Sequence, residues 1–257
     1  MTIAYCLLTI DYCLLTIDYL TTQIKMITIK NITKAYKGIT AVDIEQLEFQ
    51  VGEVIGLVGN NGAGKTTLFR LLLDLIRVDS GEILSKGKNV ATTEDWKNYT
   101  AAYIDEGFLI DYLTAEEYFY FIGKLNHLSK ASVDEFLKQY QLFFDDAILN
   151  QGKYIRDFSK GNQFKIGIIA AILSNPEFLI LDEPFANLDP STQLRLVEMI
   201  KMMAQKKQIC ILVSSHDINH VATICSRILL MEKGEIIKDI AGGATAYEEM
   251  LGYFKVK

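Results

Sequence analysis

The chain has 257 residues, half of them hydrophobic, and a formal net charge of −6. Such a chain can bury a full core, so disorder is excluded as its main state, and its acidic balance argues against nucleic acid as a partner. The four cysteines show no CxxC spacing, which argues against a zinc ribbon or a disulfide framework and predicts a reduced, cytosolic protein. No apolar stretch reaches the length of a transmembrane helix.

Residues 1–25 are read as a separate N-terminal extension, which contains the string YCLLTID twice within residues 5–18. A period of seven keeps one face of a helix apolar, so a genuine appendage would be an apolar helix. The same perfect repeat would result if a duplicated DNA segment upstream of the true start codon had been wrongly included in the coding sequence. We favour this mis-assigned start, because the domain predicted for residues 26–257 is complete without the repeat.

Two kinds of strand pattern follow Met26. Apolar side chains alternate with polar ones around Ile27 and Ile29 and again around Leu47 and Phe49, which predicts antiparallel strands with one solvated face. Residues 54–58, 178–181 and 209–213 are almost continuously apolar, as in parallel strands covered on both faces. The predicted fold class is therefore α/β, with a mixed core sheet and an antiparallel β subdomain.

A glycine-rich segment follows the first of these buried strands. GNNGAGKT matches the phosphate-loop pattern GxxxxGK[ST] and leads into a predicted helix over residues 68–75. The glycines let the loop amides surround phosphates, Lys65 adds a positive charge with a catalytic role, and the Thr66 hydroxyl is a candidate Mg²⁺ ligand. The expected nucleotide-binding residues here are Gly59, Asn60, Asn61, Gly62, Ala63, Gly64, Lys65, Thr66 and Thr67.

Residues 91–160 change to charged and aromatic helical patterns, which predicts an α-helical subdomain inserted in the core. Thr114 with Glu117, and Ser132 with Glu135, have the spacing of capping boxes, in which a hydroxyl and a carboxylate satisfy the first amides of a helix.

FLILDEP places two carboxylates where the second buried strand ends, which is where ligands bind in open α/β sheets. Asp182 is the candidate Mg²⁺ ligand. Glu183 is the candidate catalytic base that would orient or deprotonate an attacking water.

The segment FSKGNQFKIGIIAAIL, residues 158–173, narrows the many phosphate-loop NTPases to one family. The chain resembles the ATP-binding cassette subunit of an ABC transporter from Met26 to about residue 240. In that resemblance Ser159, Lys160, Gly161 and Asn162 take the place of the LSGGQ signature, which contacts the ATP of the partner in a head-to-tail dimer. Ser159 and Gly161 match the signature, whereas Lys160 and Asn162 are variants.

The resemblance assigns three further positions. Tyr36 takes the place of the aromatic that stacks on adenine, and Asp189 lies in a segment similar to the D-loop that couples the two sites. His216, in SSHD, resembles the switch histidine that contacts the γ-phosphate. A helical zinc site formed by His216 and His220 is the weaker interpretation, because HDINH lacks the glutamate of HExxH.

The sequence departs from the family pattern at two places. A glutamine that binds Mg²⁺ is usual where the core enters the helical subdomain, but here Asp105 or Glu106 takes the place. A carboxylate can ligate Mg²⁺ but repels a triphosphate. After the signature, Phe164 and Lys165 replace the usual Gln-Arg pair. Some exporting cassettes share both departures, so the resemblance favours export.

The resemblance implies an ATP- and Mg²⁺-dependent ATPase that forms a homodimer or a heterodimer with another cassette. It would energise a separate membrane permease and lie on the cytoplasmic face of the membrane, without nucleic acid. Two alternatives stay open at this point: a non-transport cassette ATPase acting on ribosomes or DNA, and a small-molecule phosphate-loop kinase.

Overall fold

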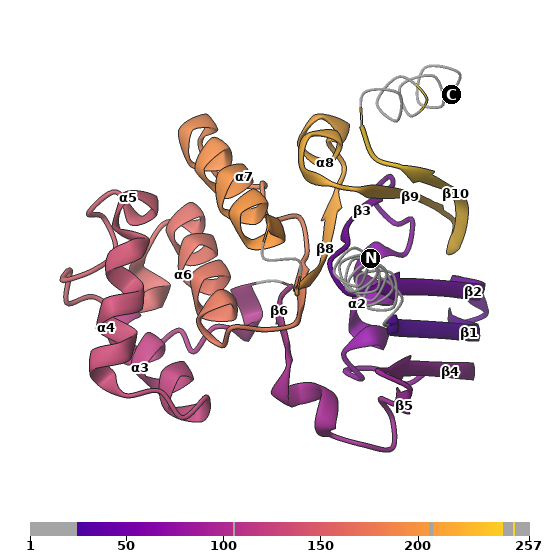
Figure 1. Ribbon diagram of the computed structural model, residues 1–257, viewed down its shortest axis with the longest axis horizontal. Helices are drawn as coiled ribbons and strands as arrows, with labels where there is room; N and C mark the ends of the chain where they lie inside the picture. The colour runs from indigo at the N-terminus through magenta and orange to yellow at the C-terminus, as the bar shows by residue number, and fades with distance from the viewer. Residues whose placement is uncertain (1–24, 105, 206–207, 244–248, 250–257) are drawn as a thin grey trace, which may run out of the picture.

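The computed structural model describes residues 25–104, 106–205, 208–243 and 249 (Figure 1). The repeat in residues 5–18 lies outside these ranges, so both interpretations of the N-terminal extension stay predictions. Within the described ranges, no helix is both long enough and apolar enough to cross a lipid bilayer.

Ten strands and seven α-helices are assigned in the described residues. The strands are β1 (Lys25–Tyr36), β2 (Ile39–Gln50), β3 (Val54–Val58), β4 (Ser80–Ser85), β5 (Lys88–Asn89), β6 (Thr100–Tyr103), β7 (Phe178–Leu181), β8 (Cys210–Ser215), β9 (Arg227–Glu232) and β10 (Glu235–Ala241). The α-helices are α2 (Lys65–Leu72), α3 (Ala115–Leu125), α4 (Lys130–Gln139), α5 (Gln141–Phe144), α6 (Lys160–Leu173), α7 (Pro190–Gln205) and α8 (Ile218–Ile224). Short 3₁₀ turns η1 (Asp95–Asn98), η2 (Glu106–Phe108) and η3 (Ile155–Asp157) lie between them.

The core sheet has six strands in the order β10-β9-β3-β8-β7-β6, of which only β10 pairs antiparallel. The three strands predicted from continuous apolar runs, β3, β8 and β7, are neighbours at its centre, and every residue in them is buried. The predicted mixed sheet is confirmed.

Successive residues of these strands pack into two different cores. Leu57, Ile180 and Leu212 face α2 and the antiparallel sheet, whereas their neighbours Val58, Leu181 and Val213 face α6, α7 and α8. Burial of one such side chain contributes about 1.5–3 kcal/mol, so layers on both faces stabilise the sheet. This three-layer packing explains why the strands read as continuous apolar runs rather than as alternating ones.

A second sheet has the order β2-β1-β4-β5 and is antiparallel throughout. Ile27 pairs with Phe49 and Ile29 with Leu47, so the apolar positions predicted to share a face do so. All four side chains are buried in the core that also contains α2. Figure 1 shows this sheet to the right of β3 and β8, and the helical lobe of α3 to α6 to their left.

The helical lobe differs in extent from the predicted range of 91–160. Thr100–Tyr103 is strand β6 of the core sheet and pairs in parallel with β7, so the predicted range was wrong at this point. The error has a physical cause: TAAY is a short segment without turn residues, and its strand conformation comes from pairing with β7, which lies far away in the sequence.

One of the two predicted capping boxes is confirmed and the other is wrong. The Thr114 hydroxyl accepts from the Glu117 amide at 3.2 Å, and the Glu117 carboxylate accepts from the Thr114 amide at 2.9 Å. Helix α4 instead begins after Ser129, whose hydroxyl accepts from the amide of Ser132 at 3.1 Å. An earlier start adds helical hydrogen bonds and still places the buried Val133 and Leu137 on one face.

The two serines of this helix start give a matched test. Ser129→Ala is expected to lower the free energy of unfolding by about 1 kcal/mol, because it removes the N-cap. Ser132→Ala is expected to cost less than about 0.5 kcal/mol, because its exposed hydroxyl only contacts that of Ser129. Urea unfolding of both variants measures the difference, and a larger cost for Ser132→Ala would contradict the observed helix start.

Candidate functional site

The glycine-rich loop connects β3 to α2, and its glycines are required by close backbone contacts. A Cβ atom on Gly59 would lie 2.4 Å from the carbonyl oxygen of Met231. A Cβ atom on Gly64 would lie 2.3 Å from that of Ala41, and Gly64 also has a φ of 110°. Any side chain at either position would force the loop away from β2 and β9.

The loop has the features of an anion site. The Gly64 N-cap of α2 provides no side-chain hydrogen bond, so the first amides of the helix stay open at its positive end. Lys65 and Thr66 lie in the first turn of this helix, with Thr67 beside them. The Lys65 side chain is only 6 % exposed and its Nζ donates to the Gly59 carbonyl at 2.7 Å, which curls the loop around the ammonium group.

Asp182 follows β7 directly and lies against the phosphate loop. Its carboxylate accepts from the Thr66 hydroxyl at 2.6 Å, and the residue is 4 % exposed. Burial raises the pKa of Asp182, opposed by the hydrogen bonds from Ser214 and Thr66. The two residues predicted to bind Mg²⁺ thus lie side by side at the phosphate loop, and both present oxygen atoms, the ligands that Mg²⁺ prefers.

Glu183 contacts both of the other predicted catalytic residues. Its Oε1 lies 3.3 Å from Lys65 Nζ, and its Oε2 lies 2.8 Å from His216 Nδ1. The amide of His216 also donates to Oε2, at 3.2 Å. Oε1 is buried and accepts no hydrogen bond from any described residue. Lys65, Glu183 and His216, which are far apart in the sequence, thus meet at one point.

Ser214 is a site residue that the sequence analysis did not single out. Its hydroxyl donates to the Asp182 carboxylate and accepts from the Glu183 amide at 2.8 Å. The only sequence signal was a serine placed where a buried apolar strand continues, a position at which a hydroxyl needs a partner.

Comparison with known proteins identifies the family. The sequence profile of the ABC transporter family matches residues 43–186, more than half of the chain. The chain belongs to the ABC transporter family. It is an ATP-binding subunit and an ATPase.

Curated relatives and solved structures agree with this. The ABC transporter ATP-binding protein YhaQ of Bacillus subtilis is 33% identical over 82% of this chain and 69% of its own length. The probable sulfate/thiosulfate import ATP-binding protein CysA of Chlorella vulgaris is 32% identical over 82% of this chain and 89% of its own. These relatives are named as transporter subunits, so they do not favour the ribosome or DNA alternative.

A solved ATP-binding subunit of an ABC transporter superposes with a TM-score of 0.76 at 26% identity, over 88% of this chain and 93% of that chain. A dimeric cassette bound to ADP and phosphate gives 0.74 at 23% identity, over 84% of this chain and 98% of that chain, and this likeness shows the fold.

Tyr36 of this ABC ATPase ends β1 and is 47 % exposed. It pairs with Ile39 across the hairpin. Ile39 lies two residues before Ala41, whose carbonyl leaves no room for a side chain at Gly64 of the phosphate loop. An exposed aromatic close to the phosphate loop is compatible with base stacking, which stays a prediction.

The signature residues form the start of α6, away from the phosphate loop of the same chain. The Ser159 hydroxyl accepts from the Asn162 amide at 3.3 Å, and Ser159 and Lys160 are exposed. A Cβ atom on Gly161 would lie 2.6 Å from the carbonyl of Asn187, so this position also needs glycine. Figure 1 shows α6 and α2 well separated across the molecule.

Asp189 caps α7 within the chain. Its carboxylate accepts from the hydroxyls of Ser191 and Thr192, each at 2.6 Å, and from both of their amides. The hydrogen bonds from Ser191 and Thr192 hold the pKa of Asp189 well below its usual range. The structure thus gives this carboxylate an internal partner set, and its predicted contact with nucleotide remains untested.

Of the two departures from the family pattern, the structure describes the side chains of the second, Phe164 and Lys165, but not those of the first. Asp105 lies outside the described residues, and Glu106 is placed only by its backbone, which begins η2. The ring of Phe164 packs edge-on against Tyr103, with centroids 5.2 Å apart. The Lys165 ammonium lies 3.0 Å from the Asp145 carboxylate. Both replacements therefore have partners within this chain.

His220 lies on α8 with its ring stacked on Phe185, centroids 4.3 Å apart, and its Nδ1 is 3.7 Å from the Asp217 carboxylate. His216, in contrast, is held by Glu183. The two histidines are thus placed by different neighbours.

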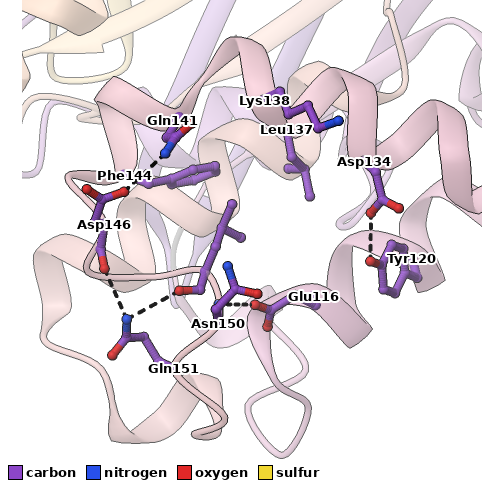
Figure 2. Close-up of a pocket in the computed structure, with 11 residues that line it drawn as sticks. Glu116, Tyr120, Asp134, Leu137, Lys138, Gln141, Phe144, Asp146, Asn150 and Gln151 are labelled. Atoms are coloured by element: carbon purple, nitrogen blue, oxygen red, sulfur yellow. Dashed lines mark hydrogen bonds between the residues drawn. The ribbon is translucent and has the colours of Figure 1, made fainter.

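A separate cleft of about 570 Å³ lies in the helical lobe (Figure 2). Three acidic residues line it, and each has a partner there: Glu116 accepts from the Asn150 amide, Asp134 from the Tyr120 hydroxyl and Asp146 from Gln141. Lys138 also lines the cleft, so three carboxylates face one ammonium group, and this balance disfavours a triphosphate.

Proposed function

We propose that two copies of this ATPase, or this chain and another cassette, close head to tail on two ATP molecules and hydrolyse them to energise a separate membrane permease. One observation carries the proposal: Lys65, Glu183 and His216 converge on the phosphate loop, while the exposed signature helix lies apart from it. A second chain can bring its signature to this loop, where open amides at the helix start would meet the triphosphate.

The residues that meet at the phosphate loop have distinct roles in this proposal. Lys65 neutralises the β- and γ-phosphates. Glu183 orients the attacking water with Oε1, which accepts no hydrogen bond from the described residues and faces Lys65 at 3.3 Å. His216 holds the other carboxylate oxygen and faces the γ-phosphate. Mg²⁺ bound to Thr66 and Asp182 would supply charge neutralisation of the phosphates.

ATP binding must exchange the contacts of Lys65. In the structure, the Lys65 ammonium donates to the Gly59 carbonyl and faces the Glu183 carboxylate. The phosphates offer stronger, charged acceptors, so Lys65 turns to them and leaves Glu183 Oε1 for water. Binding of substrate therefore prepares the base.

For the direction of transport we propose export, supported by the resemblance of Asp105, Glu106, Phe164 and Lys165 to exporting cassettes. Curated relatives include an import protein, so family membership alone leaves the direction open. The gene neighbourhood tests it: an adjacent permease gene with about six hydrophobic spans and no gene for a substrate-binding lipoprotein supports export, whereas an adjacent lipoprotein gene contradicts it. The subunit would then lie on the cytoplasmic face of the membrane through its permease.

A mixed-dimer experiment tests the shared site. One chain carries Lys65→Ala and the other Ser159→Glu, which places a carboxylate where the triphosphate would approach. Each variant alone is expected to be inactive. In a mixture, a head-to-tail dimer regains one intact site per mixed pair, so about a quarter of the parental ATP turnover is expected for sites that act independently.

The control pairs the Lys65→Ala chain with a chain that carries both substitutions, since every site is then defective. Activity in that mixture would reveal contaminating ATPase. A test mixture no more active than its two separate components would contradict the shared site.

A further inference from the structure

Glu183 has a backbone conformation that its surroundings must hold. Its φ is 47°, in the left-handed region, where a residue with a side chain costs about 1–2 kcal/mol relative to the ordinary regions. This conformation directs the side chain toward Lys65 and His216, which contact its two carboxylate oxygens. A different φ would turn the carboxylate away from both.

Ser214 lies where it can hold this conformation. Val213 of β8 pairs with Leu181 of β7, so Ser214 stands opposite the first residue after β7, which is Asp182. Its side chain is fully buried, with 0 % exposure. The position is thus fixed by strand register and shielded from water.

The hydroxyl of Ser214 acts both as a hydrogen-bond acceptor and as a hydrogen-bond donor at the site. It accepts from the Glu183 amide at 2.8 Å and donates its own proton to the Asp182 carboxylate. The resulting chain runs from the Glu183 amide through the hydroxyl to the carboxylate, and each bond polarises the next. One side chain therefore connects the backbone of the base with the carboxylate that contacts Thr66.

We propose that Ser214 is a positioning residue for ATP hydrolysis: it fixes the left-handed backbone of Glu183 and thereby the aim of the catalytic carboxylate. This inference rests on the proposed role of Glu183 as the base. Within the described residues, Ser214 hydrogen-bonds to Glu183 and Asp182 and not to the phosphate loop, so its loss should affect turnover and leave ATP binding in place.

The test is Ser214→Ala, which removes the hydroxyl without adding bulk. Loss of this bond leaves the Glu183 amide without a partner in the left-handed conformation, so that conformation becomes less populated and kcat is expected to fall about 10- to 100-fold. The Kd for a fluorescent ATP analogue is expected to change less than about 2-fold. In the nucleotide-free protein, hydrogen exchange of the Glu183 amide should become about 10-fold faster. Ser214→Thr keeps the hydroxyl and should restore both kcat and amide protection.

Ser85→Ala is the matched control. Ser85 is 1 % exposed and its hydroxyl lies 3.0 Å from that of Tyr99, in the antiparallel sheet. It should lower thermal stability as Ser214→Ala does but keep the parental kcat. Parental kcat in Ser214→Ala would overturn the proposal, as would unchanged exchange of the Glu183 amide in Ser214→Ala.

The same series separates the two hypotheses. If Glu183→Gln keeps the parental turnover, the proposed base is wrong, whatever Ser214 does. If Glu183→Gln is inactive but Ser214→Ala has parental turnover, only the positioning role fails.

Discussion

Lys65→Ala is expected to weaken ATP binding about 10- to 100-fold. Hydrogen bonds to charged groups contribute about 1.5–3 kcal/mol, and about 1.4 kcal/mol corresponds to a tenfold change in Kd. The side chain is 6 % exposed in a loop that curls around it, so no other cation replaces it from solvent. Titration with a fluorescent ATP analogue measures the Kd.

Two comparisons make this result specific. Lys97→Ala removes a lysine that pairs with Glu94 on the surface, and it should leave the Kd unchanged. AMP, which lacks the β- and γ-phosphates, should bind the parental chain and the Lys65→Ala chain equally. An equal loss of affinity for AMP would indicate damage to the loop rather than loss of phosphate contacts.

Glu183→Gln is expected to bind ATP and to lose about 10²- to 10⁴-fold in turnover, the usual contribution of a general base. The amide has nearly the same shape but cannot accept the proton of the attacking water. It also ends the ion pair with Lys65, so the Kd for ATP should not rise. Phosphate release measures kcat, and the nucleotide titration gives the Kd.

Glu177→Gln provides the matching change at an exposed carboxylate, which pairs with Lys86 before β7. It should retain parental kcat. Turnover at the parental rate in Glu183→Gln would contradict the assignment of the base, whereas a parallel loss of binding would point to a misfolded loop.

Much of the site could be predicted because its signals are local. The phosphate loop needs glycine at particular positions next to a buried strand, and Asp182 and Glu183 directly follow another. The capping box at Thr114 is likewise read from four neighbouring residues. Ser129 and Ser132 are both possible N-caps, and the local pattern could not decide between them. The helix start depends on the free energy gained from the additional helical residues, which local sequence does not show.

Other features depend on residues that are distant in the sequence. Strand β6 was placed in the helical insert because its pairing partner β7 lies beyond the lobe. Asp189 has the residue type expected for a D-loop, but its carboxylate is occupied by the cap of α7. Likewise, Phe164 and Lys165 departed from the family pattern, and only the packing against Tyr103 and Asp145 gave them partners.

The sequence by itself determined the α/β class, the buried strands and the chemical groups of the ATP site, since apolar periodicity and glycine positions act over a few residues. Tertiary structure alone decided how those groups meet. Register between β7 and β8 places Ser214 against Asp182, and the left-handed turn at Glu183 directs its carboxylate to Lys65 and His216. Strand order and register follow from the summed burial of two whole cores, which no short stretch of sequence contains.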